Sequence, residues 1–227
     1  MALSAYAEGA SLTFITSAGS IPLPANTAEG DLLVCCAASR SLTPPTIESG
    51  WNLIQTASGG SMASLRAWWR VATAGQAAPS VTPGVASVAN IGFIFRIRGF
   101  DPSSPIDVVG AAGGGTSQAT PSSSGIVTTR PNAWIFHLGC LGTTSSTTPT
   151  LTHYSIGVVS TTRLTAVYVG ASNKIRISLF STIWPTASDC GTDYLSTNVS
   201  SGSNARFLFA IRPEPEPAKG LMLFGVG

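Results

Sequence analysis

The chain contains many short apolar segments and no long one, and this pattern limits the folds that it can adopt. Each apolar segment ends after a few residues at a cluster of Gly, Pro, Ser or Thr. These breakers leave no long segment with apolar residues at helical spacing. Several segments are instead rich in Val, Ile, Phe and Trp, which favour strands. The sequence therefore predicts an all-β protein.

Strand-like segments occur along the whole chain. Their ranges are 11–16, 31–38, 51–57, 64–72, 88–97, 126–128, 133–141, 155–160, 164–171, 175–180 and 206–211. Many short strands with regular turn signals between them are typical of a β-sandwich or a β-barrel.

The two halves of the sequence contain similar elements in the same order. The first half reads GDLLVCCAAS, TPPTIESGWNLI, SLRAWWRVA and NIGFIFRIRG, and the second reads RPNAWIFHLGC, TTPTLTHYSIGVV, RLTAVYVGAS and NARFLFAIRP. Pro44 and Pro149 lie 105 residues apart, and Arg98 and Arg212 lie 114 residues apart. This order indicates an internal duplication. The alternative is that any β-protein rich in Ser, Thr and Pro resembles itself.

We therefore expect one β-sandwich over residues 1–212, a jelly roll built from two similar Greek-key halves at about 8–100 and 101–212. Residues 213–227 begin with alternating Pro and Glu, which favours an extended tail. The tail ends with the apolar residues Leu221, Met222, Leu223 and Phe224. A free apolar end promotes aggregation, so we expect these residues to dock on a neighbouring subunit as an added strand. The alternative is that the tail folds back on its own sandwich.

Charged residues are scarce, and this scarcity constrains the partners. They make up 10 % of the chain, against roughly 25 % in ordinary globular proteins. The net charge is +2 and the basic residues are scattered, so no nucleic-acid partner is expected. No apolar run reaches the ~18 residues of a membrane span, and no secretion signal is recognised at the N-terminus. We expect a soluble protein whose neutral, hydroxyl-rich surface suits permanent contact with other subunits.

The cysteines do not form a metal-binding pattern. Cys35 and Cys36 are adjacent, so they point to opposite faces of a strand and do not readily share a metal ion. Cys140 and Cys190 stand alone, and no pair is spaced as C-x-x-C. We expect free, buried thiols and no cofactor.

Few residues qualify as catalytic or metal-binding candidates. His137 lies in an apolar strand and His153 in a Thr-rich turn, and no G-x-S-x-G motif accompanies them. We interpret both as core or turn histidines. Asp101 and Asp107, in GFDPSSPID, are candidates to hold a calcium ion together with backbone carbonyls, but a plain turn capped by Asp is the preferred interpretation. The sequence predicts no catalytic residue and no metal site.

The tryptophans are candidates for contacts with a partner. Trp68 and Trp69 are adjacent on a strand, so one of them faces outward or into a second layer. We expect Trp68 and Trp69 to lie in the core or at a subunit interface, and the alternative is a platform on which sugars stack.

Several motifs of the sequence also resemble those of known proteins. GDLLVCCAA, a Pro-Pro loop into GWNLI, LRAWWRVATAG and VTPGVASVANIGFIFRIRGFD together resemble structural proteins of tailed-bacteriophage virions. NAWIFHLGC and the C-terminal FLFAIRP extend the resemblance to about residues 8–212. The sequence departs from the pattern at Tyr154-Ser155, where a Gly-Trp pair would recur, and this weakens the second repeat.

The resemblance implies a non-enzymatic virion protein that is made in the host cytoplasm. A capsid decoration or cement protein is the preferred function, with the major capsid protein or other virion proteins as partners and a homotrimer as the expected form. One alternative is a receptor- or carbohydrate-binding module of a tail or head fibre, with a host glycan as ligand. Another is an enzyme such as a depolymerase.

Overall fold

The computed structural model describes residues 7–14, 17–116, 121–155, 161–170, 173–199 and 202–215. The regular elements in these residues are antiparallel strands, and none of the described residues is helical. The predicted all-β fold is confirmed. The described residues accordingly offer no helix of the length and apolarity that crossing a membrane requires.

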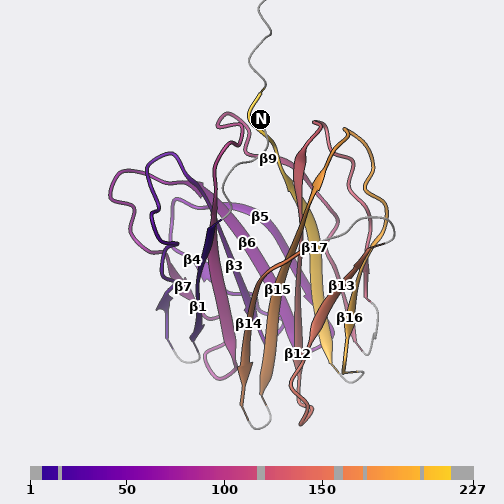
Figure 1. Cartoon of the computed structure of the whole chain (residues 1–227). Helices are drawn as coiled ribbons and strands as arrows, with labels where there is room; N and C mark the ends of the chain where they lie inside the picture. The colour runs from indigo at the N-terminus through magenta and orange to yellow at the C-terminus, as the bar shows by residue number, and fades with distance from the viewer. Residues whose placement is uncertain are drawn as a thin grey trace, which may run out of the picture.

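Two large antiparallel sheets lie at the centre of the molecule (Figure 1). The first contains, in spatial order, β1 (Ala7–Phe14), β8 (Asn90–Ile97), β3 (Leu32–Ser39), β6 (Ala63–Val71) and β5 (Asn52–Gly59). The second contains β10 (Gly113–Thr116), β17 (Ser203–Ile211), β12 (Ala133–Thr143), β15 (Lys174–Trp184) and β14 (Thr161–Val169). A further strand, β9 (Ile106–Val109), pairs with the end of β17 on the same side as β10.

Two small sheets cover the outer faces of the large ones. One contains β2 (Gly19–Ser20), β7 (Ser80–Thr82) and β4 (Thr46–Ile47), and the other contains β11 (Ser122–Ser123), β16 (Asp193–Thr197) and β13 (Leu151–Ser155). Val81 of β7 packs against the first large sheet, and Leu195 of β16 packs against the second. The molecule therefore has four layers, in the order small, large, large, small.

The two halves of the chain have the same strand order. For this comparison, β9 and β10 are counted as one interrupted strand, the first of the second half. In each half, the large sheet then contains the first, eighth, third, sixth and fifth strands in spatial order, and the small sheet contains the second, seventh and fourth. The proline loops are also held alike, because Arg66 and Arg176 each donate a 3.2 Å hydrogen bond from Nη1 to a proline carbonyl, of Pro45 and Pro149 respectively. Each half thus has two layers of its own, and the halves pack through their large sheets. The name jelly roll stays a prediction.

The main core lies between the two large sheets. Phe136 of β12 links them, because its ring centroid lies 5.2 Å from that of Phe95 in the first sheet and 5.2 Å from that of Phe209 in its own. The strands β3, β8, β12 and β17 are buried at every position. Both of their faces are covered, which explains why their sequences show apolar runs rather than alternation.

Adjacent side chains of these strands face different layers of the molecule. Cys36 packs in the main core, whereas Cys35 faces the small sheet, so the predicted opposite orientation is confirmed. Trp68 is likewise buried beneath the small sheet, and Trp69 is half-buried against the main core. Trp68 therefore faces a second layer, which leaves little of its surface for a partner. The interface role stays a prediction for Trp69.

Several predicted elements differ from the structure. The range 126–128 forms only an isolated bridge between Val127 and Asp189. The strand expected at 155–160 is instead β13, which ends at Ser155, and residues 156–160 lie outside the described residues. The start of the tail pairs with the body, because Pro213 forms a bridge with Phe100. Its apolar end, Leu221, Met222, Leu223 and Phe224, also lies outside the described residues.

Candidate functional site

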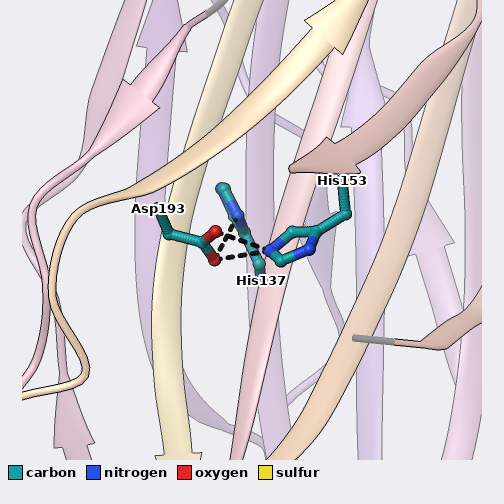
Figure 2. Close-up of side chains that lie close together, drawn as sticks. All are labelled: His137, His153 and Asp193. Carbon is teal, nitrogen blue, oxygen red and sulfur yellow. Dashed lines mark hydrogen bonds and ion pairs between the residues drawn. The ribbon is translucent and has the colours of Figure 1, made fainter. Parts of the chain in front are cut away.

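Three ionisable side chains gather between the second large sheet and its small sheet (Figure 2). His137 comes from β12 in the large sheet, and His153 and Asp193 come from β13 and β16 in the small sheet. One ligand atom from each residue lies within 4.8 Å of the others. This His–Asp–His cluster is the candidate functional site.

The strand register explains how the three residues meet. Phe136 and Leu138 face the main core, so His137 between them faces the small sheet. On the small sheet, Asp193 pairs with Ser155, and His153 pairs with Leu195 two positions along. Asp193 and His153 are therefore diagonal neighbours on one face, within reach of each other and of His137.

The carboxylate of Asp193 occupies the centre of the cluster. Its Oδ1 lies 2.6 Å from Nε2 of His153, and its Oδ2 lies 2.9 Å from Nδ1 of His137. Oδ1 also accepts a 3.0 Å hydrogen bond from its neighbour's backbone, the N–H of Tyr194. The Nδ1 contact has an ion-pair distance without the alignment of a hydrogen bond, so buried Nδ1 has no hydrogen-bond partner among the described residues.

The surroundings set the charges of the cluster. Burial alone would raise the pKa of Asp193, but the contacts with His137 and His153 outweigh it and lower this pKa to about 2. Burial lowers the pKa of His137 below its ordinary value, and the contact with Asp193 opposes this shift only in part. At neutral pH the carboxyl group is therefore ionised and the His137 imidazole is neutral.

A small cavity adjoins the cluster. Its apolar wall includes Ile135, Phe180 and Leu208, and the half-buried residues Thr182, Trp184 and Cys190 lie on its other sides. The centre of a water molecule can move within about 20 Å³ of this space, which suffices for one water. Known pockets for organic ligands are more than ten times larger, roughly 300–1,000 Å³.

Ser123 completes an arrangement that resembles a catalytic triad. Its Oγ lies 3.2 Å from Nε2 of His137, whose Nδ1 faces Asp193, which is the order of a Ser-His-Asp triad. Ser123, however, is only 3 % exposed and is not among the residues that line the cavity. The described residues therefore shield Ser123 Oγ from solvent and from the cavity.

The same place in the first half is apolar. β3 takes the place of β12 there, and its residues Leu33, Cys35 and Ala37 face the small sheet, as His137 of β12 does. Cys35 packs among apolar residues of the large and small sheets, such as Ile21 and Val81. A half of this fold therefore forms without a polar cluster in this position.

The structure also places the other candidates. Asp101 caps a turn, since its Oδ1 accepts hydrogen bonds from the backbone N–H (2.9 Å) and the hydroxyl (2.6 Å) of Ser103. Asp107 instead accepts from Nε of Arg212 at 3.1 Å and from the backbone of Thr129 at 2.8 Å. The turn interpretation is confirmed for Asp101, and the two carboxylates have separate partners.

The sequence analysis did not identify the cluster. His137 is a core histidine, as expected, but the assignment of His153 to a turn is wrong, because it lies in β13. Asp193 was not a candidate, because its strand is short and mostly polar. The one signal in the sequence is that both histidines of the chain lie in the second half.

Comparison with known proteins found no family model that matches the chain, and no significantly similar curated protein or solved structure. A functional proposal for this chain therefore depends on its own residues and surface.

Proposed function

We propose that the protein is a non-enzymatic structural subunit of a bacteriophage virion, a capsid decoration or cement protein that stabilises the head through contacts between subunits. The observation that carries the proposal is the scarcity of charge on the surface. Among the residues whose exposure the structure describes, the exposed charged residues are Glu29, Glu48, Arg130, Asp189 and Glu214, and the side chain of Arg98 is 42 % exposed. A surface with so little charge favours association over life as a free monomer.

Several of the other charged side chains are buried. Asp31, Lys174 and Arg206 are buried. Lys174 donates its ammonium hydrogens to the carbonyls of Ser145 and Ser146, and Arg206 donates to the carbonyl of Ser122. These charges hold loops and strands together and do not contribute to the outer surface. Such a surface supports permanent interfaces, which typically bury ~2,000 Å² or more.

Exposed apolar residues on the outermost strands also support association. Leu53 of β5 is 55 % exposed, and Val167 and Val169 of β14 are 40 % and 51 % exposed. β5 and β14 end the two large sheets. An outermost strand with exposed apolar side chains is a known site of pairing with another chain. β5 has no charged residue, and Arg163 of β14 donates a hydrogen bond to Ser181 of the neighbouring strand.

No observation on the described residues favours the alternatives. A glycan platform needs exposed aromatic rings, whereas Trp68 is buried and Trp69 is half-buried. A depolymerase needs carboxylates across a cleft, whereas the cavity beside Asp193 has room for one water.

The proposal is tested by the association of the purified chain and by its copy number in particles. Sedimentation velocity at increasing concentration is expected to show an oligomer, with a trimer as the expected form. Association is expected to change little between low and high salt, because the surface is nearly uncharged. Mass spectrometry of particles from a phage that encodes the chain is expected to find it at a copy number comparable to that of the major capsid protein. A strict monomer that is absent from purified particles would refute the proposal.

A further inference from the structure

We propose that Nδ1 of His137, Nε2 of His153 and a carboxylate oxygen of Asp193 bind one zinc ion, with a water molecule from the adjoining cavity as the fourth ligand. This proposal goes beyond the structural function proposed above and does not depend on it.

The donor set and its geometry suit zinc. Two imidazole nitrogens and one carboxylate oxygen are common zinc ligands, each at about 2.0–2.2 Å from the ion. The three donor atoms lie within 4.8 Å of one another and point into one space (Figure 2). The contacts of 2.6 and 2.9 Å are shorter than the ~3.3 Å that separates ligands around a tetrahedral ion. Binding of the ion therefore requires Asp193 to move outward and the two imidazole nitrogens, which lie within 4.8 Å of each other, to come to a similar separation.

The buried Nδ1 atom of His137 is the second observation that supports a metal ion. Its Nδ1 is buried and has no hydrogen-bond partner among the described residues, although a carboxylate oxygen lies 2.9 Å away. A buried nitrogen in this state costs free energy. A cation between Nδ1 and the carboxylate removes this cost, because both atoms then donate lone pairs to it.

The outer contact of His137 fits the same assignment. Ser123 Oγ lies 3.2 Å from Nε2, the nitrogen on the far side of the ring. Histidines that bind a metal usually donate the other ring N–H to a fixed acceptor, which sets the tautomer. Ser123 lies directly opposite Asp193 on the neighbouring strand, so β11 holds this acceptor in place.

The cavity provides space for the fourth ligand and access for the ion. It has room for the one water that a site with three protein ligands needs as its fourth ligand. Thr182, Trp184 and Cys190 line it and are only half-buried, so an ion has a route to the cluster from the surface.

The first half of the chain serves as an internal comparison. There, the residues of β3 that face the small sheet are Leu33, Cys35 and Ala37, and they pack with apolar residues such as Ile21 and Val81. Packing of the small sheet on this strand thus does not require an ionisable side chain in it, and buried ionisable groups are costly unless they are paired. The cluster therefore has a role that packing does not explain, and a zinc ion would join β12 of the large sheet to β13 and β16 of the small one.

The test is zinc binding by the full chain in a Cys190→Ser background. Cys190 is the one cysteine of the chain that is not fully buried, so this substitution removes the accessible thiol. After EDTA treatment and dialysis, titration calorimetry is expected to show one zinc ion per chain. The melting temperature is expected to rise by about 5 °C or more when free zinc exceeds the dissociation constant about a hundredfold. Cobalt is expected to give the visible absorption of a four-coordinate ion.

Matched variants locate the ion. His153→Ala and Asp193→Asn are each expected to weaken zinc binding by more than about 100-fold, whereas Ser123→Ala, which removes only the acceptor for Nε2, is expected to weaken it by about 10-fold. Thr165→Ala, an exposed position of β14, is the control and is expected to bind zinc as the parent does. Absence of zinc binding and of any thermal shift in the parent would overturn the proposal. So would a folded Asp193→Asn variant with the affinity of the parent.

Discussion

Arg96 donates a 3.2 Å hydrogen bond from Nη1 to Oδ2 of Asp31, and both side chains are almost fully buried in the first half of the chain. Asp31 also accepts from Nη2 of Arg98 at 3.1 Å and from the backbone N–H of Ala28 at 2.8 Å. Burial would raise the pKa of Asp31, but these hydrogen bonds outweigh it, so the pKa lies below its ordinary value. The carboxylate joins the start of β3 to the end of β8.

Asp31→Asn is expected to lower the free energy of unfolding by about 2–3 kcal/mol. The substitution keeps the size of the side chain but removes the charge that two arginines share, and Arg96 is left buried without an ionic partner. Urea denaturation measures the effect. Glu29→Gln, an exposed position two residues away, is the control and is expected to change stability by less than about 0.5 kcal/mol. Equal effects of the two substitutions would show that the buried pair does not stabilise the fold.

Acid is expected to weaken the fold through the same residue. Because the pKa of Asp31 is lower in the folded than in the unfolded chain, the unfolded chain binds more protons in acid. The stabilisation is therefore complete above about pH 4, the ordinary pKa of Asp, and is lost as the pH falls below it. Urea midpoints measured from neutral pH to pH 3 are expected to fall less steeply in Asp31→Asn than in the parent. A parallel decline in both proteins would contradict the assignment.

A close approach of the two halves requires glycine. A Cβ added to Gly114 of β10 would lie 2.1 Å from the carbonyl oxygen of Ser58 and 2.7 Å from Cα of Gly59, both in β5. Gly114→Ala is therefore expected to destabilise the protein by about 1–3 kcal/mol, because the backbones of the halves must move apart. Gly113→Ala is the matched control, since its Cβ would meet only the far end of the Arg206 side chain, at 3.3 Å. Thermal unfolding of the pair measures the difference, and equal melting temperatures would exclude a tight contact here.

Most strands of the large sheets could be predicted from the sequence, whereas β9 and β10 of the second large sheet and the strands of the small sheets could not. β3, β8, β12 and β17 are covered on both faces, so they appear as apolar runs, and the predicted ranges overlap all four. The strands of the small sheets have two to five residues, which is too short for a period to be visible.

The candidate site was missed for the same reason. His153 and Asp193 lie on two of these short strands, and the sequence separates His137, His153 and Asp193 by 16 and 40 residues. Only the pairing of β13 with β16, and the packing of both on β12, brings the three together. A motif search along one chain does not detect such a site.

Association through the β14 edge is expected to depend on its apolar side chains. Val169→Glu places a charge among Val167, Val169 and the neighbouring exposed threonines, so burial of this edge by another subunit would then cost free energy. Sedimentation velocity is expected to show a shift toward monomer. Leu42→Glu, an equally exposed apolar position in a loop outside the strands, is the control and is expected to associate as the parent does. Unchanged association of Val169→Glu would exclude the β14 edge as the interface.

The cost of the polar cluster without metal can be measured against the first half. In EDTA, Asp193→Ala is expected to destabilise the protein, because it removes the hydrogen-bond partner of His153 and the carboxylate that lies 2.9 Å from Nδ1 of His137. The triple substitution His137→Cys, His153→Leu and Asp193→Leu instead imitates the apolar packing around Cys35. It is expected to be at least as stable as the parent in EDTA, since replacing a buried ionic cluster by apolar residues is often neutral or stabilising. Urea denaturation compares the three proteins. A triple variant less stable than Asp193→Ala would mean that the cluster itself holds the small sheet in place.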